Sequence, residues 1–168
     1  DVYLFVTCLI DQFVPDAGVD TVRLLQREGI RVHFPLDQTC CGQPAYSAGF
    51  LDEARAVARS QLHLFPEPWP IVVPSGSCAA MMRHHYAKLF GGEPALSSKV
   101  MAFSERVFEL TEFLVNVVKF DCKDCAESTS VALHTSCHAR RELGIHESSE
   151  KLLRGLAQVS LIEHDRVE

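Results

Sequence analysis

The chain has 168 residues, of which 47% are hydrophobic and 23% are charged, and its formal net charge at pH 7 is -6. This composition is typical of a globular protein and excludes wholesale disorder, a collagen-like repeat and a long coiled coil. The negative charge provides no general attraction to nucleic acid, and no apolar run approaches the roughly 20 residues that a membrane helix needs. Residues 1–6 lack the basic flank and the length of a signal peptide. We therefore expect a cytoplasmic protein, with peripheral attachment to the inner membrane through a complex as the alternative.

Strands and helices alternate along the first half of the chain. Apolar runs predict strands at residues 2–6, 30–34 and 71–73, and apolar residues at helical spacing predict helices at 15–29 and 51–65. This alternation is the pattern of an open, Rossmann-like parallel sheet with helices on both faces. We therefore expect an α/β fold.

Two of the predicted connections carry cysteines. Residues 38–44 contain a glycine and a proline, so they predict a loop, and this loop holds the adjacent pair Cys40 and Cys41. Residues 75–77 predict a turn, which places Cys78 in the first turn of the following helix. Free backbone amides at that position stabilise a thiolate.

The second half of the chain predicts two further elements. Apolar residues at helical spacing between positions 103 and 118 predict one core-facing helix. Residues 120–130 are polar, and a strand is predicted to start at Val131 and to lead toward Cys137.

The opening unit recurs later in the chain. A shift of 129 positions relates pairs of similar residues in the same order of strand, cysteine, helix and strand. The pairs are Val2 and Val131, Leu4 and Leu133, Cys8 and Cys137, Leu24 and Leu153, Ile30 and Val159, and Val32 and Leu161. We therefore expect a tandem pseudo-repeat, with one unit over residues 1–120 and the start of a second over 121–168. The same shift moves Cys40 beyond the last residue, so the second unit is expected to stop before its own cysteine pair.

Four of the seven cysteines are predicted to share one site. Cys8, Cys40, Cys41 and Cys78 each follow a predicted strand, and the carboxyl ends of parallel strands lie at one edge of a sheet, where ligands bind. Four thiolates held together repel one another unless a cation neutralises them. Zinc or an iron-sulfur cluster would serve, and an adjacent cysteine pair fits a multi-iron cluster better than a small tetrahedral zinc site.

The cysteine motifs resemble those of a known family. They are residues 5–9 (FVTCL), 39–46 (TCCGQPAY) and 74–81 (PSGSCAAM). Their combination resembles the cysteine-rich CCG domain family, which includes the cysteine-rich subunit of heterodisulfide reductase and the glycolate oxidase and lactate-utilisation iron-sulfur subunits. It is most similar to the lactate-utilisation type. Ser136, Cys137 and His138 resemble the start of a second CCG unit, so Cys137 is expected to belong to a second, incomplete site.

The resemblance implies an iron-sulfur electron-transfer subunit that takes part in the oxidation of L-lactate to pyruvate together with other iron-sulfur and accessory subunits. The alternatives are a subunit that serves glycolate or another 2-hydroxy acid, a heterodisulfide reductase-like subunit, or a structural zinc-binding module. Heterodisulfide reductases of the family have a fifth cysteine where this chain has Met81. The resemblance therefore implies a [4Fe-4S] cluster on Cys8, Cys40, Cys41 and Cys78, which isolated protein can lose. The backbone of Gly42 and the residue Ser77 are expected to donate hydrogen bonds to its sulfurs, and no catalytic residue is assigned.

Other candidate residues have simpler interpretations. Cys122 and Cys125 form a lone C-x-x-C in a polar stretch and are interpreted as loop thiols. Each cysteine taken alone could be a small buried hydrophobic residue, and oxidation could pair any two that lie close together. Four histidines near the cysteines are interpreted as ordinary solvent-facing or core residues; they are His84, His85, His134 and His138. The alternatives are hydrogen-bond donors near the site for His84 and His85, and a better-supported place in the lining of the second site for His134 and His138. A thiol hydrolase built on Cys78 is not favoured, because the G-x-S-x-G motif is absent.

Overall fold

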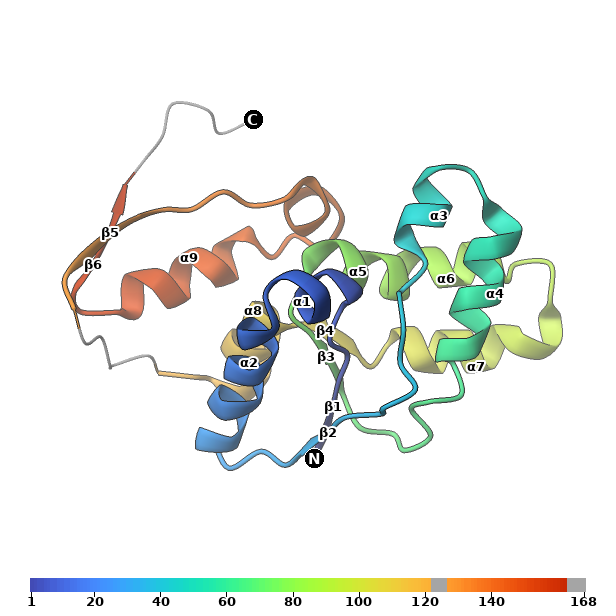
Figure 1. Ribbon diagram of the computed structural model, residues 1–168, viewed down its shortest axis with the longest axis horizontal. Helices are drawn as coiled ribbons and strands as arrows, with labels where there is room; N and C mark the ends of the chain where they lie inside the picture. Colours follow the sequence, from blue (N-terminus) through green and yellow to red (C-terminus); the bar gives the residue numbers. More distant parts are fainter. Residues whose placement is uncertain (122–126, 163–168) are drawn as a thin grey trace. The chain divides into compact units, whose positions relative to one another are not determined.

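A computed structural model describes residues 1–121 and 127–162 of the chain (Figure 1). The chain divides into two compact units, Asp1–Leu110 and Thr111–Glu168. Cys122 and Cys125 lie outside the described residues.

The first unit is built on a four-stranded parallel sheet. Its strands are β1 (Val2–Leu4), β2 (Val32–His33), β3 (Ile71–Val73) and β4 (Val107–Glu109), arranged in the order β2-β1-β3-β4. β1 and β3 are buried along their whole length, which explains why both read as continuous apolar runs in the sequence. The predicted α/β fold with an open parallel sheet is confirmed.

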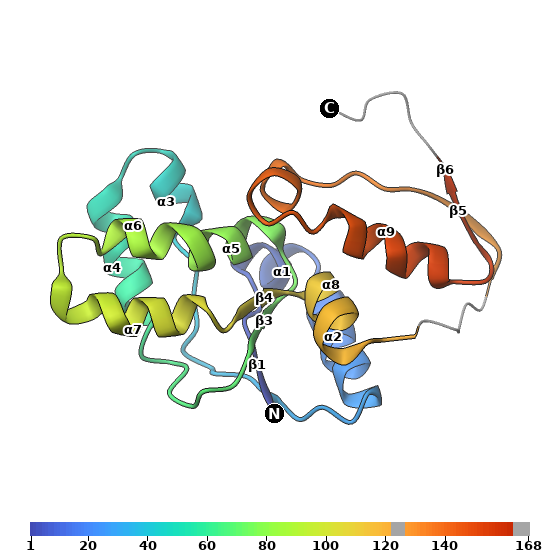
Figure 2. The same ribbon diagram turned by 180° about the vertical axis from the view of Figure 1, so that it is seen from behind.

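Helices cover both faces of this sheet. They are α1 (Cys8–Phe13), α2 (Pro15–Arg27), α3 (Gln43–Ser47), α4 (Leu51–Gln61), α5 (Gly76–Ala80), the π-helical η1 (Met81–His85), α6 (Tyr86–Leu89) and α7 (Pro94–Ser104). α2 lies on one face, whereas α4, α6 and α7 lie on the other (Figures 1 and 2). This division follows from the strand order, because the crossover from β1 to β2 runs in the direction opposite to the later crossovers, and nearly all such crossovers are right-handed. The direction in which the chain crosses along the sheet therefore reverses between the parallel strands β1 and β3. Such a reversal marks the binding crevice of an open α/β sheet.

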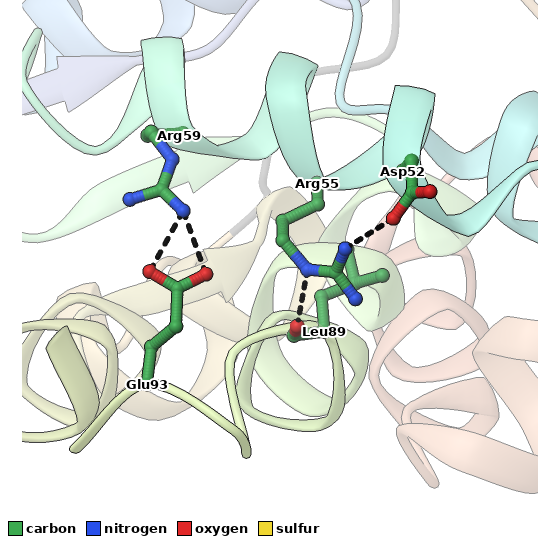
Figure 3. A network of polar contacts seen from close by, with 5 residues as sticks. All are labelled: Asp52, Arg55, Arg59, Leu89 and Glu93. Carbon is green, nitrogen blue, oxygen red and sulfur yellow. Dashed lines mark hydrogen bonds and ion pairs between the residues drawn. The ribbon is translucent and has the colours of Figure 1, made fainter.

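A polar network ties the helices on one face together. Arg59 of α4 donates two hydrogen bonds to the carboxylate of Glu93 at 2.7 and 2.8 Å, and Arg55 donates to the Leu89 carbonyl at the end of α6 at 2.8 Å (Figure 3). Asp52 pairs with Arg55 from the first turn of α4. These contacts fix α4, which directly follows the cysteine-bearing loop and α3.

The single helix predicted between residues 103 and 118 is wrong. α7 ends at Ser104, and Val107–Glu109 forms the edge strand β4, which pairs with β3 through Ile71 and Val107. The helical spacing was misleading because a short buried strand is as apolar as a helix face, so periodicity alone cannot separate the two. Two short helical segments follow β4, α8 (Leu110–Glu112) and the π-helical η2 (Phe113–Val118).

The second unit contains a smaller parallel pair of strands. β5 (Thr129–Ala132) pairs with β6 (Val159–Ile162), and between them lie the π-helical η3 (His138–Glu142) and α9 (His146–Gly155). The strand predicted at Val131 is therefore present, although it ends at Ala132. No helix among the described residues is long and apolar enough to cross a membrane.

The strand pairing of the two units repeats with the shift seen in the sequence. Val2 pairs with Val32 in the first unit, and Val131 pairs with Leu161 in the second, so both partners move by 129 positions.

A hydrogen bond from a backbone amide to a hydroxyl three residues earlier repeats in the same way. The Ile10 amide donates to Thr7 Oγ1 at 3.4 Å, and the Ala139 amide donates to Ser136 Oγ at 3.2 Å. Thr7 immediately precedes Cys8 and Ser136 immediately precedes Cys137, so the two cysteines occupy matching places. That the second unit is a CCG unit beginning at residue 121 stays a prediction.

Candidate metal centre

Three strand ends carry the four cysteines of the first unit. Cys8 opens α1 after β1, Cys40 and Cys41 lie between β2 and α3, and Cys78 is the third residue of α5 after β3. β1 and β3 flank the point at which the crossover connections change direction along the parallel sheet. The thiols therefore lie where an open α/β sheet binds ligands.

The four thiols are in contact with one another. Cys41 Sγ lies 3.1 Å from Cys78 Sγ, although 36 residues separate the two in sequence. Cys41 also hydrogen-bonds the thiol of its neighbour Cys40, which in turn hydrogen-bonds Cys8. Cys41 and Cys78 are buried, whereas Cys8 and Cys40 are half-buried. The structure thus brings together all four cysteines selected from the sequence.

The surroundings lower the pKa of two of the four cysteines and raise the pKa of the other two. The pKa of Cys40 falls from 9.0 to about 5, chiefly because it accepts a hydrogen bond from the Cys41 thiol, with a further contribution from the Gly42 amide. The pKa of Cys78 is lowered, first by the Cys41 thiol and then by the hydroxyls of Ser75 and Ser77. The pKa of Cys41 is raised because its hydrogen bonds with Cys40 and Cys78 favour its protonated form, and burial raises the pKa of Cys8. Shared protons therefore limit the repulsion among the sulfurs.

Gly42 shapes the turn that follows the cysteine pair. Its φ of 86° lies in the left-handed region, which glycine adopts without a steric cost. This conformation lets the Gly42 amide donate to Cys40 Sγ at 3.4 Å. A Cβ atom at this position would lie 3.3 Å from the Ala54 carbonyl oxygen of α4. The loop in the structure is shorter than the loop predicted over residues 38–44, because α3 already begins at Gln43.

Ser77 and Ser75 supply hydroxyl donors to Cys78. Ser77 was predicted from the sequence and Ser75 was not, although its position at the N-cap of α5 was an available signal. Gln61 and Tyr86 were also missed. Both are fully buried polar residues in contact with the cysteine loop, and a polar residue at a core position of a helix was the only signal for them.

The remaining candidates lie elsewhere. Cys137 is exposed and belongs to the second unit. The ring of His85 stacks on Tyr46 with 4.8 Å between centroids, and His138 pairs with Glu142 at 2.8 Å. Met81, at the position of the fifth family cysteine, is fully buried.

Within residues 1–121 and 127–162, no group of three or more His, Cys, Asp or Glu side chains is arranged to hold a metal ion. Hydrogen bonds instead link each sulfur to the next, from Cys8 to Cys40, Cys41 and Cys78. The described site is therefore a hydrogen-bonded thiol cluster, and any metal centre that uses all four sulfurs must replace the protons that they share.

Comparison with known proteins identifies the family. The cysteine-rich CCG domain matches residues 2–83. The chain is 41% identical over 161 residues to lactate utilization protein A of Geobacillus sp. (strain WCH70), which covers 96% of this chain and 67% of that protein. The chain belongs to the cysteine-rich CCG domain family. The resemblance seen in the motifs is confirmed.

Further relatives of this CCG chain carry similar names. Identity is 40% over 161 residues to lactate utilization protein A of Geobacillus kaustophilus (strain HTA426), with 96% of this chain and 67% of that protein covered. Identity is 43% over 153 residues to lactate utilization protein A 2 of Bacillus cereus (strain 03BB102), with 90% of this chain and 63% of that protein covered. The chain thus spans about two thirds of the length of these relatives. The matched CCG domain contains Cys8, Cys40, Cys41 and Cys78, and it does not extend to Cys137.

Replacing Gly42 by alanine should destabilise the domain. Gly42→Ala places a side chain at φ 86° and pushes Cβ toward the Ala54 carbonyl, so we expect a loss of about 2 kcal/mol in the free energy of unfolding. Gly49 has the same φ of 86° with no neighbour within 4 Å, and Gly49→Ala should therefore cost only about 1 kcal/mol. Urea denaturation of both variants measures the difference. Equal losses would show that the approach of Cβ to the Ala54 carbonyl of α4 does not affect the free energy of unfolding.

Cys40 should remain reactive in acid. Only the thiolate is alkylated, and a pKa of about 5 keeps Cys40 deprotonated above that pH. We expect its alkylation rate in the reduced chain, before any metal is added, to be constant between pH 8 and pH 6 and to fall through pH 5. In Cys41→Ala the principal hydrogen-bond donor is lost, and the midpoint should rise. The measurement is iodoacetamide labelling followed by peptide mass spectrometry. A midpoint near pH 9 in the unsubstituted chain would contradict the hydrogen-bonded cluster.

Proposed function

We propose that the chain holds an iron-sulfur cluster on Cys8, Cys40, Cys41 and Cys78 and transfers electrons in a complex that oxidises L-lactate to pyruvate. The observation that carries this proposal is the contact among four thiols that come from three strand ends of a CCG domain. The names of the relatives, lactate utilization protein A, supply the link to lactate.

The donor set fits an iron-sulfur cluster. All four candidate ligands are thiols, which soft metal centres prefer. The pKa values of Cys40 and Cys78 are both lowered, so part of the cost of deprotonating the ligands is removed before the metal binds. Four thiolates are the ligand set of a [4Fe-4S] cluster, and the apolar Met81 supplies no fifth sulfur of the thiolate type.

The surrounding polar groups would tune such a cofactor. A bound [4Fe-4S] cluster would accept and release single electrons. The Gly42 amide lies 3.4 Å from Cys40 Sγ, and the Ser75 and Ser77 hydroxyls contact Cys78. Hydrogen bonds to ligand sulfur stabilise negative charge, so these donors favour the reduced state of the cofactor.

The rest of the electron path is assigned to other proteins. We propose that further iron-sulfur and accessory subunits oxidise lactate and receive the electrons, and that Cys137 forms part of a second site in a second CCG unit. The matching amide-to-hydroxyl hydrogen bonds of Thr7 before Cys8 and Ser136 before Cys137 support that last assignment.

Anaerobic reconstitution tests the cofactor. With iron and sulfide, the chain should turn brown and contain about four iron and four sulfide per site. Serine variants of Cys8, Cys40, Cys41 and Cys78 should each lose most of the iron and the electron paramagnetic resonance signal of the reduced cluster, whereas Cys137→Ser in the other unit should retain both at the first site. A colourless protein that binds stoichiometric zinc in place of iron would favour the structural zinc module.

A growth experiment tests the substrate. Cys40→Ser, introduced into the natural gene of the source organism, should abolish growth on L-lactate and leave growth on pyruvate intact, since only the oxidation of lactate needs the site. Gly49→Ala provides a matched control in a neighbouring turn without sulfur contacts. Growth on lactate together with a loss of growth on glycolate would reassign the substrate to glycolate.

A further inference from the structure

Two fully buried polar side chains hold the backbone of the cysteine loop, defined here as residues 39–42. The first is Gln61, the last residue of α4, which is 0% exposed. Its Oε1 accepts from the Thr39 amide at 3.3 Å, and its Nε2 donates to Thr39 Oγ1 at 2.9 Å. Thr39 is thus held at both its backbone and its side chain, directly before Cys40.

The second is Tyr86, the first residue of α6, which is also 0% exposed. Its hydroxyl donates to the carbonyl of Cys41 at 3.0 Å. Its ring stacks on Phe103 of α7 with 5.7 Å between centroids. The hydroxyl is therefore aimed from the core at the backbone of a ligand cysteine.

These two contacts come from different helices and hold the loop on either side of Cys40. Burying an amide or a hydroxyl in a core costs free energy unless it finds a partner, and a leucine or phenylalanine would fill either position without that cost. Apart from a contact between Gln61 and its neighbour Ser60, both residues direct these hydrogen bonds to the four-residue cysteine loop. The geometry therefore favours a specific task, which is to fix the directions of the Cys40 and Cys41 side chains.

We propose that Gln61 and Tyr86 are positioning residues that set how tightly the cysteine loop holds a cluster and at what potential that cluster is reduced. The effect on cluster binding and potential rests on the proposed function. The fixing of the cysteine loop concerns the chain's own residues and can be measured without a cofactor.

Tyr86→Phe removes the hydroxyl and keeps the stacked ring. In the reduced chain without metal, Cys41 is 1% exposed, and release of its carbonyl should expose its sulfur and raise its alkylation rate at least tenfold. In the reconstituted protein, iron loss to a chelator should accelerate about tenfold, a typical effect of removing an outer contact of a metal ligand. The midpoint potential of the cluster should also shift.

Tyr3→Phe is the matched control. Tyr3 is a buried tyrosine of β1 whose hydroxyl accepts from the Glu67 amide at 3.2 Å. This change deletes the same atom and one hydrogen bond to backbone, without touching residues 39–42. It should leave the alkylation rate of Cys41, the iron loss and the potential unchanged, even if it lowers the melting temperature. Gln61→Met, which keeps the volume of the side chain, should reproduce the effects of Tyr86→Phe.

The outcomes separate the two proposals. If Tyr86→Phe and Gln61→Met alter none of these rates, or alter them no more than Tyr3→Phe does, the positioning role is wrong. If the unsubstituted chain takes up no iron but Cys41 still becomes reactive in Tyr86→Phe, the loop is held as inferred and the cluster assignment fails. If the unsubstituted chain binds a cluster and neither Tyr86→Phe nor Gln61→Met changes its midpoint potential, the proposed function is supported and the inferred effect on the potential is wrong.

Discussion

The contact between Cys41 Sγ and Cys78 Sγ at 3.1 Å joins the loops that follow β2 and β3, and the chemistry of the site depends on it. Sulfurs at this distance cannot all carry a negative charge unless protons or a cation lie among them. In the structure, shared protons fulfil this role, and hydrogen bonds from Cys41 lower the pKa values of Cys40 and Cys78 while the pKa of Cys41 is raised. The arrangement is therefore prepared for a cation that binds thiolate.

The fold of the first unit brings these sulfurs together. Because the crossover connections leave β1 and β3 in opposite directions along the sheet, the loops after these two parallel strands diverge to opposite faces and leave room between them. Cys8 and Cys78 stand at the starts of the two helices that follow. The Cys40–Cys41 pair enters from β2, and α4 and α6 support it through Gln61 and Tyr86. A site built from three loops thus rests on a rigid sheet and two helices that carry buried polar groups.

Much of this architecture was predictable from the sequence. The strands at β1 and β3 and the helix α2 follow from apolar runs, a proline and a glycine, and these signals are local. The shift of 129 positions predicted equivalent strands, and the pairs Val2–Val32 and Val131–Leu161 bear the same relation in the structure. The convergence of four cysteines was predictable as well, because strand ends in a parallel sheet meet at one edge.

The features that the sequence did not reveal depend on tertiary contacts. β4 was predicted as part of a helix, since only its pairing with β3 distinguishes Val107–Glu109 from a helical stripe. Gln61 and Tyr86 resemble ordinary helix residues until the fold places the cysteine loop against them. Ser75 becomes relevant only through its contact with Cys78. In each of these cases a tertiary contact decides the role of the residue.

The claim that four sulfurs bind one cofactor is tested most directly by Mössbauer spectroscopy of the chain reconstituted with ⁵⁷Fe. The account predicts the spectrum of a [4Fe-4S] cluster in which every iron has sulfur ligands alone, and its loss when Cys78 is replaced by serine. A spectrum of isolated iron, or one that is unchanged in the Cys78→Ser variant, would contradict it.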